Sequence, residues 1–407
     1  MDNTINKQGG RYVGEGTYGC VFTPPLKCKS GKTIKNAKKP FKNNEAIGKV
    51  FENGDEESIQ FEIKTAKFFK QLDPNNEFTV PYYGRCITDS DVADRSDGIE
   101  NCTIIQENPY NVSQLIYANG GDDLDIVIDN IHGKYKDLKF DRFVMLFKPI
   151  MKGLLKLNKR GYAHADIKPN NLVYSKKDGL VKMIDFGLMK LLKQLNHNHI
   201  LKFHSPFQPP EANILYYISI GVINELQIYE HVMKNFNSYN YISMVNFLEF
   251  AKYDEKLREF IKVAVAMNIA DLSKHFNSIF VNKYDIYSLG MSFVDIVYHL
   301  RADNGLNIID DNLFTAFIKS VVVPMIDPNP YNRVGILECY MNMEMFYNQY
   351  SGKKAAFDSE FFAKFVNIND LRAMLKKYKR PIYGNKKMLY DRVLSIKLQT
   401  NIKQRVV

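Results

Sequence analysis

The hydrophobic pattern changes its main character near Gly120 and Gly121. Before this point apolar residues alternate around glycines, as in residues 11–23, which favours β-hairpins. After it they recur with helical spacing, and the longest such stretches are residues 140–159, 244–266, 283–300 and 312–322. The sequence therefore predicts an α+β chain in which a small β-rich part precedes a larger helical part.

Charge is distributed unevenly along the 407 residues. The net charge is +10, but residues 371–407 contain 11 Lys or Arg and a single acid, Asp391, which leaves 44 basic and 44 acidic residues elsewhere. The body of the chain is therefore neutral. A confined basic segment can meet nucleic acid, an anionic membrane surface or an acidic partner, and it can also be a solvated helix face.

Cysteine and hydropathy patterns bear on the environment of the chain. The five cysteines are widely spaced and include no C-x-x-C pair, so the sequence predicts neither a disulfide framework nor a zinc site and favours a reducing cell interior. The N-terminus is polar, and no stretch reaches the roughly 18 apolar residues that a membrane-spanning helix needs. We therefore expect a soluble intracellular protein, cytoplasmic and without a membrane partner.

A glycine-rich motif lies in the first predicted hairpin. It follows the pattern G-x-G-x-x-G-x-V, in which glycines let backbone N–H groups approach nucleotide phosphates. A dinucleotide-binding fold would need a helix directly after the motif, whereas strand-like residues and then Pro24-Pro25 follow here. The motif is a candidate nucleotide-binding element made of Gly14, Glu15, Gly16, Thr17, Tyr18, Gly19, Cys20 and Val21.

Two further motifs follow in the predicted helical part. The first reads HADIKPNN at residues 164–171, and the second reads DFG at residues 185–187, after a predicted hairpin. They resemble the H-R-D-x-K-P-x-N catalytic loop and the D-F-G element of protein kinases, and the order of the three motifs is that of the family. The resemblance implies a bilobal protein-kinase fold, with a small β-rich N-lobe at residues 10–118 and a larger α-helical C-lobe at residues 119–345.

The resemblance implies a role for each polar residue of these motifs. Phosphoryl transfer depends on positioning and charge neutralisation, with oxygen ligands for a metal and a carboxylate for the acceptor's proton. Asp166 would be that carboxylate, and Lys168 would offer its ammonium group to the transferred phosphoryl group. Asn171 and Asp185 would hold Mg²⁺ on the phosphates of ATP. The Lys168-Pro169 pair resembles the serine/threonine class.

The family pattern also implies a lysine on the third strand and a glutamate on the following helix. Residues 46–51 resemble the V-A-I-K strand and supply Lys49, and the predicted helix at residues 58–72 supplies Glu62, with Glu57 as an alternative.

The segment between the lobes is expected where a predicted strand at residues 114–117 meets two glycines. By resemblance, backbone groups of Ile116 and Ala118 would meet the adenine, and Asp122 or its rival Asp123 would reach the ribose.

Features further along the chain resemble a kinase C-lobe. Pro210-Glu211 matches the end of A-P-E, DIYSLG at residues 285–290 matches the D-x-[WY]-S-x-G helix start, and Arg333 would pair with Glu211. Between Glu211 and Asp285 lie 73 residues, where the family pattern needs about one or two dozen. We expect an insertion at about residues 212–280 that packs as helices onto the C-lobe.

Two departures from the family pattern concern regulation. Ala165 replaces the arginine that receives a phosphate from the activation segment, and Ser205 is the only hydroxyl side chain between Asp185 and Glu211. We therefore expect activity without phosphorylation of that segment. The whole, with GEGTYGCVFTPPLKC at residues 14–28, resembles the divergent serine/threonine kinases of large nucleocytoplasmic DNA viruses, which implies a host-cell cytoplasm or a virion.

The basic tail resembles a SAP motif, a helix-loop-helix that binds DNA. Lys379-Arg380 stands where that motif prefers Gly-Leu, and a basic solvated helical hairpin is the alternative. We expect a module at residues 366–398 and sequence-independent, salt-sensitive DNA binding through residues 366–407. Its core would contain Leu371, Met374, Leu375, Met388, Leu389, Val393 and Leu394, and its phosphate contacts would be Lys376, Lys377, Lys379, Arg380, Lys386, Lys387 and Arg392.

The motifs together indicate an ATP- and Mg²⁺-dependent serine/threonine protein kinase that acts on protein hydroxyls. The competing class is a pseudokinase scaffold localised to nucleic acid by the basic tail, and a small-molecule kinase is a lesser rival. Asp166, Lys168, Asn171 and Asp185 are all present, whereas decayed kinases typically lose one. The expected architecture is an α+β bilobal fold with a helical insertion and a small helical C-terminal module.

Overall fold

The chain divides into two compact units. In the computed structural model the first unit comprises Met1–Gly121 and Lys182–Gly187, and the second comprises Asp122–Val181 and Leu188–Val407. The first is rich in strands and the second in helices, as the change of period predicts. The structure describes residues 10–16, 19–29, 45–52, 54–88, 98–103, 112–138, 140–195, 205–237, 250–302, 315–351 and 359–396.

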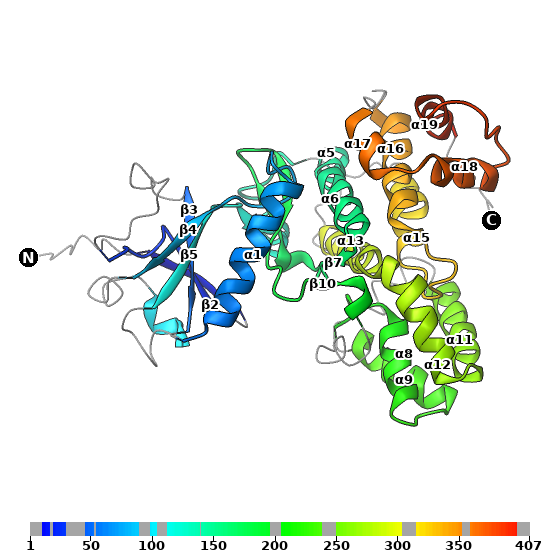
Figure 1. Cartoon of the computed structure of the whole chain (residues 1–407), viewed down its shortest axis with the longest axis horizontal. Coiled ribbons are helices and arrows are strands. Elements are labelled where there is room, and N and C mark those ends of the chain that lie inside the picture. The colour runs from blue at the N-terminus through cyan, green and yellow to red at the C-terminus, as the bar shows by residue number, and fades with distance from the viewer. Residues whose placement is uncertain are drawn as a thin grey trace, which may run out of the picture. The chain divides into compact units, whose positions relative to one another are not determined.

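The first unit is built on an antiparallel sheet, drawn in blue and cyan in Figure 1. Among the described residues its strands follow the order β1-β2-β3-β5-β4. A helix, α1, packs on this sheet through Ile59, which meets Phe51 and Leu115. The elements are β1 (Arg11–Gly16), β2 (Gly19–Thr23), β3 (Ala46–Phe51), α1 (Glu56–Leu72), β4 (Tyr82–Ile87), the 3-10 helix η1 (Ile99–Asn101) and β5 (Ser113–Ala118).

Two aspartates flank the helix α1. The side chain of Asp55 accepts the backbone N–H of Ser58 and caps the first turn, where a helix leaves its N–H groups without partners. Beyond the last turn, the buried carboxylate of Asp73 accepts the backbone N–H groups of Glu77, Phe78 and Thr79. The helix therefore starts where Asp55 supplies an acceptor. It ends before Pro74, which cannot continue a helix, and the Asp73 carboxylate holds the segment that follows.

Two disulfides in the first unit correct the expectation of free thiols. Cys20 is bonded to Cys102, and Cys28 is bonded to Cys86. Cys339, which is buried, is the free cysteine among the described residues. The paired cysteines are 82 and 58 residues apart and meet only once the sheet has formed, so their spacing carries no signal.

The second unit is mostly helical (green to red in Figure 1). Its first part contains β6 (Asp122–Asp123), α4 (Leu124–Asp129), α5 (Phe140–Met145), α6 (Lys148–Lys159), β7 (Tyr162–Ala163), η2 (Pro169–Asn171), β8 (Leu172–Ser175), β10 (Lys190–Leu191) and η3 (Leu192–Gln194). The strand β9 (Leu180–Met183) begins in the second unit, and its last two residues belong to the first. The single helix predicted at residues 140–159 is two helices, because Pro149 cannot supply an N–H within a helix and instead lies in the first turn of α6.

The rest of the second unit continues with long helices. It contains α8 (Pro210–Ser219), α9 (Glu225–Asn237), α11 (Phe250–Ala266), α12 (Ile269–His275), the π-helix η4 (Phe276–Phe280), η5 (Val281–Lys283), α13 (Tyr284–Ala302), the π-helix η7 (Ile318–Val322), α15 (Val323–Met325), α16 (Ile336–Ser351), α17 (Ser359–Phe365), α18 (Ile368–Lys377) and α19 (Lys386–Leu394).

The described part of the expected insertion packs as helices. The helix α11 contacts α8 and α9 and buries an apolar face that includes Leu257, Phe260 and Ile261. The guanidinium of Arg258 lies 3.5 Å from the ring centre of Tyr229 on α9, and the hydroxyl of Tyr253 lies 2.8 Å from that of Tyr287 on α13. Buried apolar side chains and the Arg258–Tyr229 contact therefore hold the insertion together, and the buried Tyr253–Tyr287 contact joins it to α13.

The C-terminal helices form a helical hairpin that also packs on α16. The helices α18 and α19 contact each other, and α19 contacts α16. The expected core residues are buried except for Met388, which is 47% exposed. Tyr390 occupies the core instead and stacks edge-on against Phe362 of α17, with ring centres 4.5 Å apart. The helical period therefore predicts the module, but the inward face of α19 is turned from the one expected.

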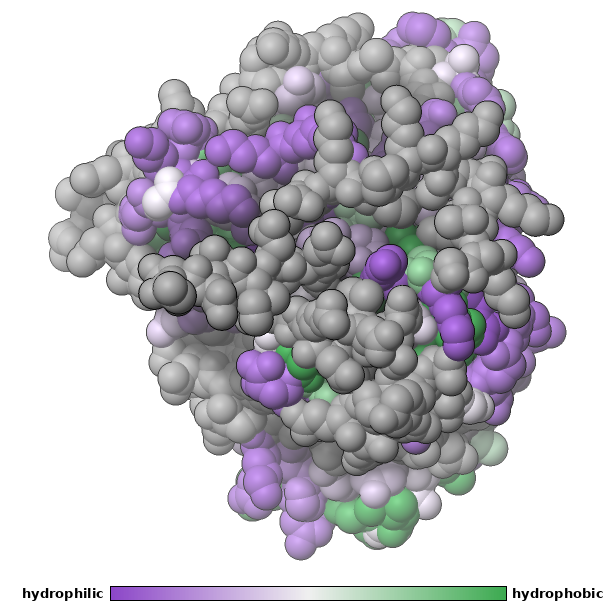
Figure 2. All heavy atoms as spheres, turned by 90° about the vertical axis from the view of Figure 1, so that its left-hand side faces the viewer, coloured by the Kyte–Doolittle hydropathy of each residue, from purple (hydrophilic) through white to green (hydrophobic). Residues whose placement is uncertain are grey.

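Among the described residues, no helix is both long enough and apolar enough to cross a membrane. The face drawn in Figure 2 carries mainly hydrophilic side chains among its described residues, with small separate hydrophobic groups.

A buried ion pair links α8 to the segment before α16. The carboxylate of Glu211 accepts two hydrogen bonds from the guanidinium of Arg333, at 2.7 and 2.8 Å, and both side chains are almost fully buried. Arg333 also donates to the carbonyl oxygen of Asp327 at 3.0 Å. The pair expected from the sequence is therefore formed.

Replacing one partner of this pair should destabilise the second unit strongly. We expect Arg333→Met to lower the free energy of unfolding by roughly 3–5 kcal/mol, because the carboxylate of Glu211 would be left buried without a counter-charge. Urea unfolding followed by circular dichroism measures the change. The matched control is Lys256→Met, which breaks the more exposed pair with Asp327 and should cost about 1 kcal/mol or less. Equal losses for the two variants would contradict this account.

Candidate functional site

The glycine-rich motif forms the predicted hairpin of β1 and β2. Gly16 pairs with Gly19 at the described ends of the strands, and Thr17 and Tyr18 lie outside the described residues. A Cβ atom on Gly19 would lie 2.2 Å from the carbonyl oxygen of Val50 on β3, so only glycine fits at this position. A Cβ atom on Gly14 would meet no other atom within 4 Å. The hairpin thus combines a close backbone packing with an open glycine face.

A lysine, a glutamate and an aspartate meet in the first unit. Lys49 on β3 forms an ion pair with Glu62 on α1, and its Nζ lies 3.8 Å from Oδ1 of Asp185. The side chains of Lys49 and Glu62 are only 14% and 15% exposed. Glu57, the alternative to Glu62, is exposed. The structure therefore brings Lys49 together with Glu62, the glutamate expected to pair with it, and with Asp185.

The D-F-G element is tied to the helix α1 and to the segment after it. The ring of Phe186 packs on that of Phe69 of α1, with centres 4.1 Å apart. The backbone N–H of Met183 donates to the carbonyl of Phe78 at 2.8 Å. Asp185 itself adopts a left-handed backbone conformation, with φ of 54°, and accepts the N–H of Gly187. These contacts fix the carboxylate beside Lys49.

Tyr117 is a residue of this cluster that the sequence analysis missed. Its hydroxyl, at the end of β5, donates a hydrogen bond of 2.7 Å to Oε2 of Glu62. Burial and the neighbouring Glu62 carboxylate raise the pKa of Tyr117 well above its usual value, so the hydroxyl keeps its proton and acts as a donor. The available sequence signal was a tyrosine, which carries a hydroxyl group, directly after two apolar residues of a predicted strand.

A second contact holds the first turn of α1. The guanidinium of Arg85 on β4 donates two hydrogen bonds to the carboxylate of Glu56, at 2.7 and 2.8 Å, and a third to the hydroxyl of Ser113 on β5. Hydrogen bonds from Arg85 and Gln60 lower the pKa of Glu56 to about 2. The helix is therefore bound to the sheet at Glu56 and again at Glu62.

The backbone groups expected to meet adenine are already engaged in the sheet. The N–H of Ala118 donates to the carbonyl of Pro81 at 2.8 Å, and Ile116 lies between Gly48 of β3 and Gly84 of β4. The N–H of Ala118 is therefore already used within the first unit, and the role of Ile116 and Ala118 at adenine stays a prediction. The N–H of Gly120 has no hydrogen-bond partner among the described residues.

Both candidate ribose acids have partners within the second unit. Asp122 accepts hydrogen bonds from Nζ of Lys134 and the hydroxyl of Tyr135, at 2.6 and 2.7 Å. Burial acts to raise the pKa of Asp122, but these two donors outweigh it, so the pKa is lowered. Asp123 caps α4 by accepting the N–H of Ile126. Burial raises the pKa of Asp123. The carboxyl group of Asp122 is therefore more readily ionised than that of Asp123, which caps a helix.

The catalytic-loop motif places three polar side chains together in the second unit. Nδ2 of Asn171 donates to both Oδ2 and the carbonyl oxygen of Asp166, at 2.7 and 2.8 Å. Nζ of Lys168 lies 3.1 Å from Oδ2 of Asp166. The Asp166 side chain is 26% exposed, whereas Asn171 is buried. The Asp166 carboxylate therefore reaches solvent while the buried Asn171 amide fixes its orientation. All three predicted residues are brought together.

The backbone of this loop is held by Asp285, at the start of α13. Its carboxylate accepts the N–H groups of His164 and Ala165, at 2.8 and 2.9 Å. Burial raises the pKa of Asp285 although these two bonds act in the opposite direction. Ala165 has φ of 65°, a conformation that β-carbon-bearing residues rarely adopt. The two hydrogen bonds therefore hold a loop that the backbone alone would not favour.

The described part of the activation segment contains Ser205 in a local turn. Its hydroxyl oxygen accepts the N–H of Phe207 at 3.3 Å, and its carbonyl accepts the N–H of Gln208 at 3.0 Å. The residues between 196 and 204 lie outside the described part of the chain. Ser205 thus has a structural use that does not require a phosphate.

Comparison with known proteins identifies the family. The sequence model for the protein kinase domain matches residues 8–215, just over half of the chain. The chain belongs to the protein kinase domain family. The match spans the glycine-rich motif, the catalytic loop and the D-F-G element, and it ends soon after Glu211.

Curated relatives are similar over shorter segments. The chain is 35% identical over 96 residues to the serine/threonine-protein kinase cds1 of Schizosaccharomyces pombe, which covers 23% of this chain and 20% of that protein. It is 31% identical over 103 residues to the serine/threonine-protein kinase HAL4/SAT4 of Saccharomyces cerevisiae, covering 24% and 16%. The matched segments thus span a fifth or less of each relative. The resemblances to viral kinases and to the SAP motif stay predictions.

Removing the Tyr117 hydroxyl should weaken the function of this kinase-family site without unfolding it. We expect Tyr117→Phe to lower the rate of phosphate transfer about tenfold, because a hydrogen bond to a charged group contributes roughly 1.5 kcal/mol or more to orienting Glu62. Steady-state kinetics with ATP measures the loss, and thermal unfolding should change little. Tyr82→Phe is the control, since that ring packs on Tyr117 without a contact to Glu62. If both variants kept the wild-type rate, Tyr117 would have no positioning role.

Proposed function

We propose that the chain is an ATP-dependent serine/threonine protein kinase, which transfers the γ-phosphate of Mg-ATP to protein hydroxyls. The observation that carries this proposal is the cluster of Lys49, Glu62 and Asp185 in the first unit. A lysine held beside two carboxylates presents an oriented positive charge to nucleotide phosphates, and the family uses this pair for that purpose.

The residues of the second unit supply the chemistry at the acceptor. Asp166 accepts the proton of the acceptor hydroxyl, and Asn171 keeps its carboxylate oriented. Lys168, 3.1 Å from Asp166, neutralises charge on the transferred group. Phosphoryl transfer needs little covalent participation by the protein, so this positioning and charge supply most of what the reaction requires.

Magnesium fits the donor atoms that the chain supplies. Nδ2 of Asn171 is committed to Asp166, which leaves its amide oxygen for a cation, and Asp185 provides a carboxylate. Oxygen atoms of this kind are the ligands that Mg²⁺ prefers. When bound, Mg²⁺ would neutralise the phosphates and orient them for transfer.

For adenine we propose a donor other than the pair first expected. The N–H of Gly120 is without a partner among the described residues, whereas that of Ala118 is bonded to Pro81. Gly120 has no side chain to obstruct a ring that approaches its backbone. We therefore assign Gly120 as the backbone donor to adenine and keep Asp122 as the ribose acceptor.

Serine/threonine specificity rests on two supports. The Lys168-Pro169 pair is typical of that class, and the relatives named above are serine/threonine-protein kinases by their names. The pseudokinase alternative is disfavoured because Asp166, Lys168, Asn171 and Asp185 are all present. The same Lys168-Pro169 pair and the extended helical part disfavour a small-molecule kinase.

Phosphate transfer from γ-labelled ATP with Mg²⁺ onto a generic basic protein tests the proposal directly. We expect the wild type to form phosphoserine or phosphothreonine, and Asp166→Asn and Asp185→Asn to lose about 100-fold or more of the rate. Asp178→Asn is the control, because this aspartate is exposed in the turn between β8 and β9. Ser205→Ala belongs in the same series and should keep the wild-type rate.

The outcome separates the enzyme from the scaffold. ATP binding without any transfer by the wild type would favour the pseudokinase reading. Loss of transfer in Asp178→Asn to the same extent as in Asp166→Asn would show that the assay reports stability and not catalysis.

We also propose that the C-terminal hairpin binds DNA without sequence preference, and one backbone feature favours it. Lys379 has φ of 53° directly after α18, so the position where a SAP motif prefers glycine has the conformation that favours glycine. Several basic side chains are committed elsewhere: Lys386 to the carbonyl of Phe362, Arg392 to those of Pro381 and Tyr383, Lys387 to Asp391 and Lys377 to Glu338. Exposed Lys376, Lys379 and Arg380 are therefore the candidates for phosphate contacts.

Substitution tests this surface better than deletion, because α19 packs on α16. We expect the triple variant Lys376→Ala, Lys379→Gly, Arg380→Ala to reduce the slope of log affinity against log salt by about 2.7, since each phosphate contact contributes about 0.9. Titration of a labelled duplex measures the slope. Glycine relieves the left-handed strain at 379 and so protects the fold. An unchanged slope in the triple variant, matching the control Lys262→Ala, Lys274→Ala, would place DNA binding elsewhere.

A further inference from the structure

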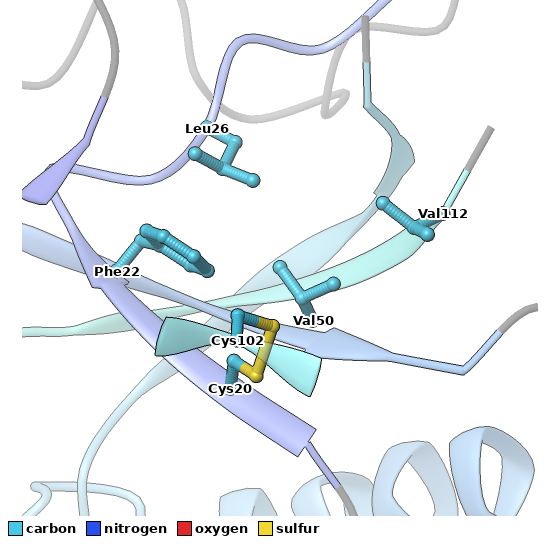
Figure 3. Close-up of a cluster of buried hydrophobic side chains, with 6 residues drawn as sticks. All are labelled: Cys20, Phe22, Leu26, Val50, Cys102 and Val112. Atoms are coloured by element: carbon cyan, nitrogen blue, oxygen red, sulfur yellow. A yellow bond between two sulfur atoms is a disulfide. The ribbon is translucent and has the colours of Figure 1, made fainter. Parts of the chain in front are cut away.

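The segment of residues 98–103 is joined to the glycine-rich hairpin by a covalent bond and by hydrogen bonds. Cys102 forms a disulfide with Cys20 of β2, the residue after the third glycine of the motif (Figure 3). The hydroxyl of Thr103 donates to Oε1 of Glu15, between the first two glycines, and its backbone N–H donates to Oε2 at 3.4 Å. The segment therefore holds both strands of the hairpin.

Packing reinforces these bonds. Cys20 and Cys102 are fully buried in one cluster with Phe22, Val50 and Val112 (Figure 3). Tyr12 of β1 and Ile99 pack against the same cluster. Gly98 has φ of 75°, and a Cβ atom there would lie 3.0 Å from Cβ of Tyr12, so the segment approaches β1 as closely as a glycine permits.

We propose that residues 98–103 are a positioning element for the glycine-rich hairpin, and that the Cys20–Cys102 disulfide is required for tight binding of ATP. The inference rests on the proposed function, because it assumes that the hairpin covers the phosphates of ATP. A glycine-rich hairpin has many accessible backbone conformations, and ordering it on binding costs affinity. The disulfide and the Glu15–Thr103 contacts remove much of that freedom before ATP arrives.

The proposal makes ATP affinity depend on redox conditions. In forming the disulfide, two thiols lose two protons and two electrons to an oxidant such as glutathione disulfide, which is reduced to two glutathione molecules. A dithiol such as dithiothreitol reverses the step and becomes a cyclic disulfide. The positioning residues Cys102 and Thr103 would act on ATP only through the hairpin.

The second disulfide is a natural control. Cys28 and Cys86 lie in a separate cluster with Ala46 and Ile116, and this bond joins the chain after β2 to β4. It crosses the same unit and involves no residue of the glycine-rich motif. Its loss should therefore affect stability without a specific effect on the hairpin.

The test compares ATP binding by full-length variants under non-reducing conditions, with the disulfides assigned by mass spectrometry of unreduced peptides. We expect Cys102→Ser to raise the dissociation constant for Mg-ATP about five- to tenfold, as expected when one or two loop residues must be ordered on binding. The paired variant Cys28→Ser, Cys86→Ser should change it less than twofold, an estimate on the same basis. Dithiothreitol should weaken binding by the wild type and leave Cys102→Ser unaffected.

A second variant keeps the covalent bond and guards against misfolding. Thr103→Val removes the hydroxyl that donates to Glu15 while preserving shape, and it should raise the dissociation constant about two- to threefold without changing thermal unfolding. Thr103→Ser should restore wild-type affinity.

The outcomes distinguish this proposal from the proposed function. Equal ATP affinity in the wild type, Cys102→Ser and Thr103→Val would overturn the positioning role and leave the kinase assignment intact. The same holds if the oxidised protein contained Cys20 and Cys102 as free thiols. A wild type that bound no ATP would overturn both.

Discussion

The position of α1 depends on the ion pair between Lys49 and Glu62. Both side chains are largely shielded from water, so their attraction is stronger than that of a surface pair, and each also contacts a further group. Glu62 accepts the hydroxyl of Tyr117, and Lys49 lies near Asp185. A strand, a helix and the D-F-G element therefore share one cluster, and the Arg85–Glu56 contact leaves α1 little freedom to move away from it.

The second unit uses buried charges for a different purpose. The carboxylate of Asp285 binds the backbone just before Asp166. The Glu211–Arg333 pair joins the start of α8 to the segment before α16. Burying charge is costly, and the cost is offset only where hydrogen bonds satisfy the charged atoms. Glu211, Arg333 and Asp285 meet that condition, which explains how such residues can lie within an otherwise apolar helical core.

The parts predictable from sequence were those encoded locally. Hydrophobic period located the β-rich and helical parts, and the family pattern selected Lys49 and Glu62, which form an ion pair in the structure. Contacts between distant segments had no such signal. The two disulfides join cysteines that meet only across the folded sheet. The N–H of Ala118 donates to the carbonyl of Pro81, which lies 37 residues earlier in the chain, just before β4. The division of the predicted helix at residues 140–159 into α5 and α6 was predictable from the sequence, because Pro149 favours the first turn of a helix over its interior.

The left-handed backbone of Ala165 and Asp185 has a consequence for how such a chain evolves. Each residue stores about 1–2 kcal/mol of strain relative to a relaxed conformation, and surrounding hydrogen bonds hold it there. Substitutions that loosen either backbone would release this strain and so favour the folded state. A lineage freed from selection for catalysis would therefore gain stability as these two backbone conformations relaxed.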